Sequence, residues 1–100
     1  MKFVFLAPNK QGVASDQGFA LLSVARDAFE YREANRVMRL EGEALFPPDA
    51  GFGFAVYPRW REARWQPPFE AVPLSDRDRE RIVRNIKEAI AFMGGMVEFE

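Results

Sequence analysis

The chain has 100 residues, of which 48% are hydrophobic and 14% aromatic, and its formal net charge at pH 7 is −1. This composition excludes an intrinsically disordered chain and a globally basic nucleic-acid binder. Because the chain contains neither cysteine nor histidine, it also excludes disulfides, thiolate nucleophiles, serine–histidine or cysteine–histidine catalysis and histidine-ligated metal sites.

The first segment, residues 2–7 (KFVFLA), is β-prone, and the residues PNKQG after it predict a turn. Its apolar run ends at Pro8 and is shorter than the roughly 7–15 residues of a secretory signal. No stretch of the sequence approaches the ~20 apolar residues of a membrane span. We therefore expect a cytoplasmic protein with no membrane partner.

Residues 13–18 are small and polar and predict a loop, whereas residues 19–46 fit two different structures. Many good helix formers in the longer segment favour a helix. The alternation of apolar and polar residues favours instead two strands that meet at a turn formed by Ala34 and Asn35. Asn35 tolerates the left-handed conformation that hairpin turns need. We favour the hairpin and keep the helix as the alternative.

The next segment contains a sharp break followed by a strand. Residues 46–51 (FPPDAG) predict a turn, because the two prolines cannot donate to a strand ladder. Residues 51–58 (GFGFAVYP) predict a strand that places alternate apolar side chains on one face. Residues 59–65 predict a short strand or an exposed connector, and the three prolines of residues 66–73 predict a stiff, extended approach to the next element.

Residues 75–95 (SDRDRERIVRNIKEAIAFMGG) predict a helix. Ser75 and Asp78 have the spacing of a capping box, and Gly94 or Gly95 is expected to end the helix in the left-handed conformation. Six apolar side chains fall within an arc of about 120°, which predicts a face that packs on a sheet: Ile82, Val83, Ile86, Ala89, Ile90 and Met93. Residues 96–100 alternate and predict a last strand with Val97 and Phe99 facing inward.

These elements predict an α+β fold. We expect an antiparallel sheet of four to five strands, one long C-terminal helix packed across it and a short last strand. The length is that of a single domain covering residues 1–100, large enough to bury a core without disulfides or metals.

One stretch, residues 59–65 (RWREARW), is a candidate binding surface. Three arginines against one glutamate give it a local charge of +2, and two tryptophans punctuate it. Tryptophan and arginine are common hot-spot residues of protein interfaces, and they also suit single-stranded nucleic acid. The alternative is that one or both tryptophans belong to the core and the arginine stems cover them, and this alternative fits Trp65, beside the prolines, better than Trp60. The candidate partner-binding residues of this stretch are Arg59, Trp60, Arg61, Arg64 and Trp65.

Carboxylates form the second group of candidates. Glu41 and Glu43, with Glu30 and Glu33, suit a basic partner, although acidic residues that alternate with apolar ones are also typical of the wet face of a sheet. Arg79 is placed over the apolar face of the helix and fits either a groove or a stem that covers the sheet. No nucleotide fingerprint or zinc spacing is present, so we expect no enzymatic activity, no cofactor and no metal site.

The C-terminal half resembles a known family. The motifs are a GEALF strand, the GFGFAVYP strand, the residues RWQPP at 64–68, and PLS opening a charged helix that contains I-x-x-N-I-x-x-A and is followed by a glycine and a β-prone tail. In this order they resemble the immunity protein 74 family of small bacterial polymorphic-toxin immunity proteins. The resemblance covers residues 29–99 and is best from Gly51 onward, and residues 59–63 look like a local elaboration.

The resemblance implies a protein that binds a cognate toxin inside the producing cell and blocks it without catalysis. It does not fix the contact residues: a toxin with a basic cleft would meet the glutamates, and a toxin with an acidic face would meet the arginine–tryptophan stretch. The alternative function is a single-stranded nucleic-acid-binding module built from a sheet and a helix. A homodimer that buries the Trp60 face is a third interpretation.

Overall fold

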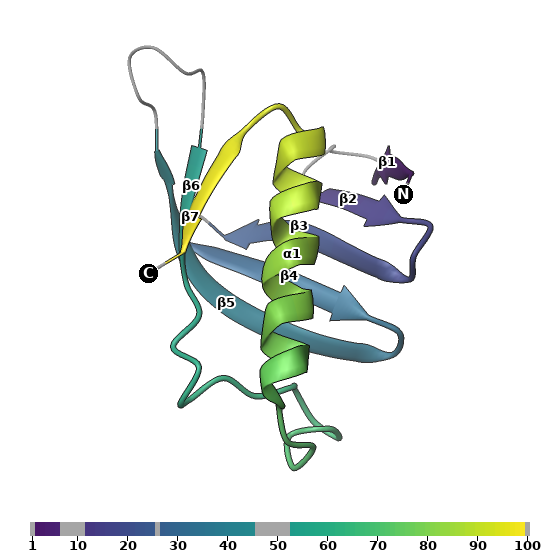
Figure 1. The fold of residues 1–100 in the computed structure, drawn as a ribbon, viewed down its shortest axis with the longest axis vertical. Helices are drawn as coiled ribbons and strands as arrows, with labels where there is room; N and C mark the ends of the chain where they lie inside the picture. The colour runs from purple at the N-terminus through teal and green to yellow at the C-terminus, as the bar shows by residue number, and fades with distance from the viewer. Residues whose placement is uncertain (1, 7–11, 26, 46–52, 100) are drawn as a thin grey trace.

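A computed structural model describes residues 2–6, 12–25, 27–45 and 53–99 of the chain. These residues form one sheet of seven strands and one helix (Figure 1). In chain order the elements are β1 (Phe3–Phe5), β2 (Gly12–Ser15), β3 (Phe19–Ala25), β4 (Ala28–Glu33), β5 (Arg36–Leu45), β6 (Gly53–Tyr57), α1 (Asp76–Phe92) and β7 (Met96–Phe99).

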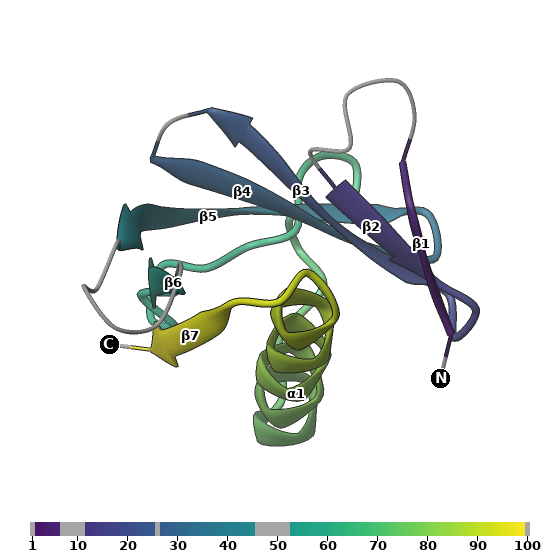
Figure 2. The same cartoon turned by 90° about the horizontal axis from the view of Figure 1, so that it is seen from above.

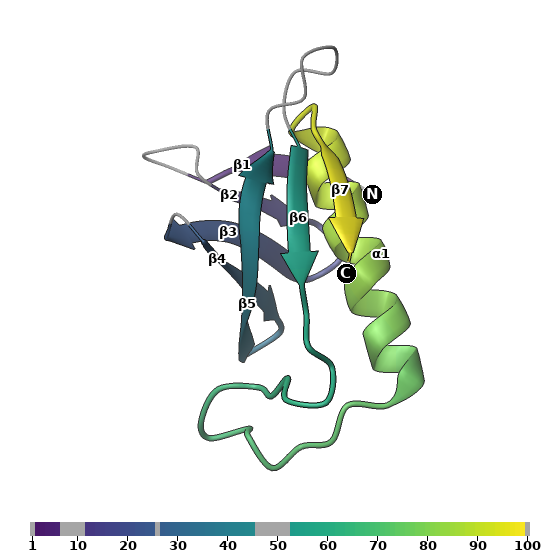
Figure 3. The same cartoon turned by 90° about the vertical axis from the view of Figure 1, so that its left-hand side faces the viewer.

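The strands lie in the sheet in the same order as in the chain. The pairs from β1 to β6 are antiparallel, and β6 and β7 are parallel, because α1 carries the chain back before β7 begins. The ten residues of β5 join two parts of the sheet: its residues 36–41 pair with β4, and its residues 41–45 pair with β6. The strand curves along its length, so β6 and β7 stand at a steep angle to β3 and β4 (Figures 1 and 3).

α1 lies across one face of the curled sheet, and the core fills the space between them (Figure 2). Four residues of the predicted apolar face, Ile82, Ile86, Ala89 and Ile90, are each at most 1% exposed. Burying an aliphatic or aromatic side chain of this size contributes about 1.5–3 kcal/mol to the free energy of unfolding. The buried side chains of the sheet that meet them are Val13, Phe19, Leu21, Phe29, Tyr31, Met38, Leu40 and Val56.

The two ends of α1 confirm the predicted caps. The hydroxyl of Ser75 accepts a hydrogen bond from the backbone N–H of Asp78 (3.1 Å), and the Asp78 carboxylate accepts one from the backbone N–H of Ser75 (2.9 Å). This second bond, with that from Arg81, lowers the pKa of Asp78. Met93 is the C-cap, and Gly94 follows in the left-handed conformation with a φ of 86°.

The hairpin expected within residues 19–46 is also confirmed. β4 and β5 pair across Ala34 and Asn35, with Tyr31 opposite Met38 and Glu33 opposite Arg36. The residue with the positive φ is Ala34, at 55°, whereas the sequence suggested Asn35 for that role. An alanine in this conformation carries a steric cost from its Cβ that a glycine would not.

The number of strands and the length of the helix correct the expected architecture. The sheet has seven strands rather than four to five, and α1 is 17 residues long and ends at Phe92, so it is not the long helix expected. β2 occupies much of the segment expected as a loop, because its small residues pair through their backbones and only Val13 has the large buried side chain of a strand. The parallel pair of β6 and β7 corrects the fully antiparallel sheet.

Three predictions fall on residues outside those that the structure describes: the turn at residues 8–12, of which only Gly12 is described, the turn at residues 46–51, and the first two residues of the strand predicted at 51–58. The predicted last strand is observed as β7, where Val97 and Phe99 pack against the core and Glu98 is exposed. In the part of the chain that the structure covers, the helix is too short and too polar to cross a bilayer.

Candidate partner-binding surface

The chain between β6 and α1, residues 58–75, is named here the connector, and it runs along the lower end of the sheet to the start of the helix (Figure 3). It begins with a tight turn: the backbone N–H groups of Glu62 and Ala63 both donate to the carbonyl of Arg59, at 2.8 and 3.0 Å. Arg59 has a φ of 49°. The Arg64 guanidinium donates to the carbonyls of Arg61 (3.3 Å) and Ala63 (2.9 Å), so the turn is held by its own residues.

Trp65 anchors the connector in the core. Its side chain is 1% exposed and lies 6.4 Å from the ring of Tyr31, with the guanidinium of Arg36 over its other side at 5.9 Å. The next residue, Gln66, donates its backbone N–H to the carbonyl of Val37 on β5 at 2.7 Å. Trp65 is therefore a core residue, which corrects its place among the surface candidates.

A groove lies on the face of β5 and β6 that is turned away from α1, and it is named here the outer groove. It consists of two adjoining pockets of about 390 and 240 Å³. Side chains alternate along β5, so Arg39, Glu41 and Glu43 share this face while Met38 and Leu40 point into the core. The charged and aromatic residues that line the groove are Asp27, Arg39, Glu41, Glu43, Tyr57, Arg59, Glu62 and Arg64.

Two contacts order the middle of the outer groove. Arg59 forms an ion pair with Glu41 at 3.2 Å, and the Tyr57 hydroxyl donates to the Glu43 carboxylate at 2.9 Å. These residues are more than ten positions apart in the sequence, and the pairing of β5 with β6 brings them together. Both ion-pair side chains are more than 60% exposed, so the pair adds little to stability and stays accessible to a partner.

Arg39 is a member of the groove that the sequence reasoning missed. It lines both pockets, its side chain is exposed, and no other described residue forms a hydrogen bond or ion pair with it. The sequence does contain a sign of this: Arg39 lies two residues before Glu41, and residues two apart on a strand point to the same face of the sheet. The β4 end of the groove carries the carboxylates of Asp27 and Glu43, and its connector end carries the guanidinium of Arg64 beside the carboxylate of Glu62, while Arg39 and Arg59 line both pockets.

A third pocket, of about 450 Å³, lies on the other side of the turn, between the connector and the first turns of α1, and is named here the connector pocket. Trp60, Val72 and Leu74 give it apolar walls, since all three are half-buried and pack against the core. Its charged residues are Arg61, Arg64, Glu70 and Arg79. Ala63 and Arg64 line both this pocket and the outer groove, so the turn separates the two.

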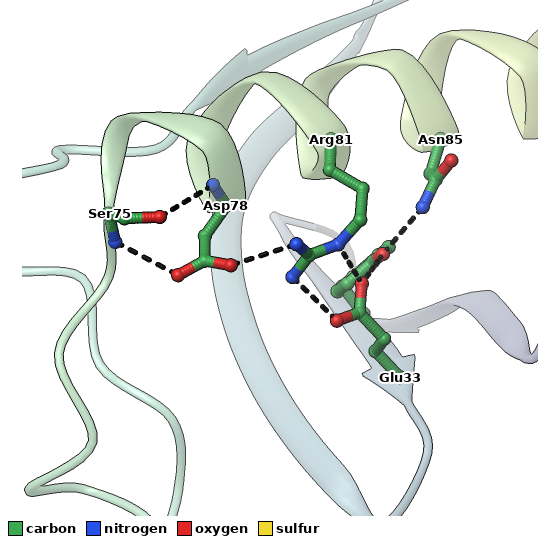
Figure 4. A network of polar contacts seen from close by, with 6 residues as sticks. Glu33, Ser75, Asp78, Arg81 and Asn85 are labelled. Carbon is green, nitrogen blue, oxygen red and sulfur yellow. Dashed lines mark hydrogen bonds and ion pairs between the residues drawn. The ribbon is translucent and has the colours of Figure 1, made fainter.

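A network of polar contacts fixes the first half of α1 to the sheet (Figure 4). Arg81 donates to both oxygens of Glu33, at 2.7 and 2.9 Å, and to Asp78 at 2.8 Å. The Tyr31 hydroxyl donates to Glu33 at 2.6 Å and accepts from the amide of Asn85 at 2.9 Å. Burial and the neighbouring Glu33 raise the pKa of Tyr31, and the bonds to Glu33 raise that of Arg81.

This network removes Glu33 from the acidic candidates for a partner, because both its oxygens bind Arg81. Glu30 pairs with Arg32 at 3.2 Å. The seven residues proposed from the sequence divide by location: Glu41, Glu43 and Arg59 line the outer groove, Trp60 and Arg61 line the connector pocket, Arg64 lines both, and Trp65 is in the core.

Comparison with known proteins gives one match. A family model described as Immunity protein 74 matches residues 21–100, which confirms the resemblance inferred from the C-terminal motifs and extends it to most of β3. Neither a curated protein nor a solved structure matches the chain.

Proposed function

Because the chain belongs to the immunity protein 74 family, we propose that it binds a cognate toxin protein in the cytoplasm of the bacterium that makes both, and blocks the toxin without catalysing a reaction. Inhibition of this kind needs a surface that recognises one partner. It needs no nucleophile, cofactor or metal.

The observation that supports this proposal is the outer groove. Its charged side chains come from Asp27 before β4, from β5 and from the connector, and they stand exposed on the face of the sheet that α1 does not cover. Exposed charges in a fixed pattern give specificity and fast association, since a partner with the complementary pattern is attracted and others are repelled. The groove supplies such a pattern, with a negative end and a positive end.

The groove also bears on the choice between two contact sets that the sequence left open. The glutamates and the arginines were alternative contact sets for toxins of opposite charge, and the fold places Glu41, Glu43, Arg59 and Arg64 along one surface. We therefore propose a toxin face that carries both signs of charge, with its basic residues toward Glu43 and its acidic residues toward Arg59 and Arg64.

The test begins with capture of the partner from the native cell. The tagged chain is used as bait in a nuclease-treated lysate, and each captured protein is identified and expressed from an inducible promoter in a bacterial host. We expect one captured protein to stop growth when expressed alone, and this chain to restore growth when the two are expressed together.

The matched variants are the charge reversals Glu43→Arg and Arg59→Glu, which leave the core untouched. We expect both to fold, as shown by thermal denaturation, and to protect growth less than the original chain does. The proposal fails if no captured protein is toxic, or if the original chain does not restore growth. Capture of nucleic acid that is released as salt rises would favour the nucleic-acid-binding module instead.

A further inference from the structure

We propose that the connector pocket receives an acidic side chain of the toxin that stands beside an apolar one, so that the carboxylate meets the arginines while its neighbour packs on Trp60. This inference rests on the proposed function and adds the chemistry of a second contact, on the opposite side of the turn from the outer groove. Four observations carry it: the charge of the pocket, an unpaired donor, the apolar walls and the rigid frame.

The pocket has an excess of positive charge. Three guanidiniums, those of Arg61, Arg64 and Arg79, face it against the single carboxylate of Glu70. Within the described residues the guanidinium of Arg61 has no hydrogen-bond or ion-pair partner, although its backbone carbonyl accepts from Arg64. The guanidinium of Arg79 pairs with Asp76, whose side chain is 92% exposed. A net charge of +2 in a hollow of about 450 Å³ attracts an anion.

Arg79 has a donor that nothing satisfies. Its Nε atom is buried from solvent and has no hydrogen-bond partner in the structure, although the guanidinium belongs to a half-exposed side chain. A buried donor without a partner is unfavourable, because it has lost its bond to water and gained none in return. The bond to Asp76 uses the terminal nitrogen Nη1, so the other terminal nitrogen of this guanidinium is left for a carboxylate in the pocket, with the geometry that arginine and carboxylate groups share.

The walls explain why the ligand is a protein segment with an apolar residue. Trp60, Val72 and Leu74 are half-buried, so each presents apolar surface to the pocket as well as to the core. A phosphate backbone would contact only the arginines and would leave the apolar walls without a partner. A peptide with both kinds of side chain uses the whole surface, as interface hot spots built from tryptophan and arginine do.

Both sides of the pocket are held in place. The connector is fixed by the buried ring of Trp65 and by the bond from Gln66 to Val37, and α1 is fixed by the bidentate pair of Arg81 with Glu33. A ligand therefore meets a preformed pocket and does not have to order it, which removes part of the entropic cost of binding.

The first test uses the isolated chain and needs no toxin. The probe is a blocked heptapeptide with two glutamates around one phenylalanine, and the control peptide has glutamines in their place. Binding is followed by NMR through the indole N–H signal of Trp60 and the backbone signals of residues 61–74. We expect the glutamate peptide to give saturable shifts that weaken as salt rises, and the glutamine peptide to give none.

Variants of the chain extend this test, because some are expected to weaken peptide binding and one to strengthen it. We expect Arg61→Gln and Arg79→Gln each to weaken peptide binding about two- to fivefold, since each removes an exposed ion pair. Glu70→Gln should strengthen it by a similar factor, because it removes the one repulsive carboxylate. Arg84→Gln, at an exposed position of α1 that does not line the pocket, should leave it unchanged. Equal shifts from the two peptides, no shift at Trp60, or tighter binding of a ten-nucleotide thymidine strand would overturn the inference.

The second test separates this inference from the proposed function. Arg61→Glu and Arg79→Gln are introduced in the growth assay with the captured toxin, and we expect both to reduce protection. Full protection by both variants would overturn the role of the pocket and leave the proposed function standing. If the peptide binds at the pocket but the original chain protects against no toxin, the proposed function fails, and the assignment of the pocket to a toxin fails with it.

Discussion

At the scale of single residues, the structure separates side chains that the sequence makes look alike. Trp60 and Trp65 stand in the same arginine-rich stretch, yet Trp65 is 1% exposed and Trp60 lies at a pocket. The difference arises from the bond between Gln66 and β5, a contact between segments about thirty residues apart that no local pattern reveals. The same holds for Glu33, which the fold commits to Arg81, whereas Glu43, with a similar alternating environment, stays at the surface.

The two tryptophans should therefore respond differently to truncation. We expect Trp65→Ala to lower the free energy of unfolding by about 3–5 kcal/mol, because it leaves a cavity in the core. Trp60→Ala should lower it less, by about 1–2 kcal/mol, since that side chain is only partly buried. Urea denaturation of both variants checks this, and equal losses would contradict the assignment of Trp65 as the anchor.

Ala34 offers a substitution that should stabilise the protein. Ala34→Gly removes the steric cost of the left-handed conformation, which raises the free energy of unfolding by about 1–2 kcal/mol. The greater freedom of glycine in the unfolded chain lowers it by about 0.5–1 kcal/mol. We expect a net gain of about 0.5–1 kcal/mol in the free energy of unfolding, measured by denaturant titration. Asn35→Gly is the matched control, and an equal gain there would contradict the special role of Ala34.

Tyr31 should make the free energy of unfolding depend on pH in alkaline solution. Its pKa in the folded state is raised above the ordinary value of about 10 that it has in the unfolded chain. Its contribution is therefore fully present below pH ~10 and is lost as pH rises further, because the unfolded state releases the proton first.

The comparison variant for this pH dependence is Tyr31→Phe. At neutral pH it should lower the free energy of unfolding by about 1–3 kcal/mol, because the amide of Asn85 loses its acceptor inside the core. Above pH ~10 its stability should fall less steeply than that of the original chain. Identical slopes in urea titrations at pH 9 to 11 would show that Tyr31 does not titrate as the structure implies.

At the scale of elements, the signals that the sequence carries strongly were read correctly. The capping box at Ser75, the apolar face of α1 and the hairpin turn after Glu33 each depend on residues within a few positions of one another. β2 was missed because it is built from small residues, which leave little alternation of apolar and polar side chains. β3 was missed because it lies in the segment for which a helix or only two strands were expected. The outer groove was only half predicted, since its glutamates and arginines were found but their meeting on one face depends on the pairing of β5 and β6.

Gly42 of β5 is closely packed against its neighbours. A Cβ at this position would lie 2.6 Å from a ring carbon of Phe29 and 2.7 Å from the carbonyl oxygen of Ala55, closer than real atoms approach. We expect Gly42→Ala to lower the free energy of unfolding by about 1–3 kcal/mol, as overpacking of a core does. Thermal denaturation checks this, and an unchanged midpoint would contradict the close packing around Gly42.

At the scale of the whole molecule, the core and the candidate binding surfaces occupy different parts of the fold. α1 and the inner face of the sheet hold the buried residues, and the charged groove lies on the outer face of β5 and β6 with the connector. Substitutions in the groove should therefore change binding without changing stability.

Arg39 is the residue on which to test this separation. Since its side chain forms no hydrogen bond or ion pair within the described part of the chain, we expect Arg39→Glu to leave the free energy of unfolding within about 0.5 kcal/mol of the original. The association rate with the toxin should change, and the difference between variant and original should shrink as salt rises, because exposed charges act mainly on diffusional encounter. Stopped-flow measurements at two salt concentrations check this, and a salt-independent difference would contradict it.

The anchoring of the connector has a consequence for how such a protein can change its specificity. The chain is held at Trp65 and Gln66 in the middle of the connector and enters the fold again at Ser75, so residues 59–64 form a short arc between the end of β6 and a fixed point. Because that arc contributes turn contacts rather than strand pairs, other sequences can replace it while the sheet and helix stay as they are. Under the proposed function, we expect that exchanging these six residues would change the connector's share of the partner contacts, while Trp65 and the elements beyond it keep the fold.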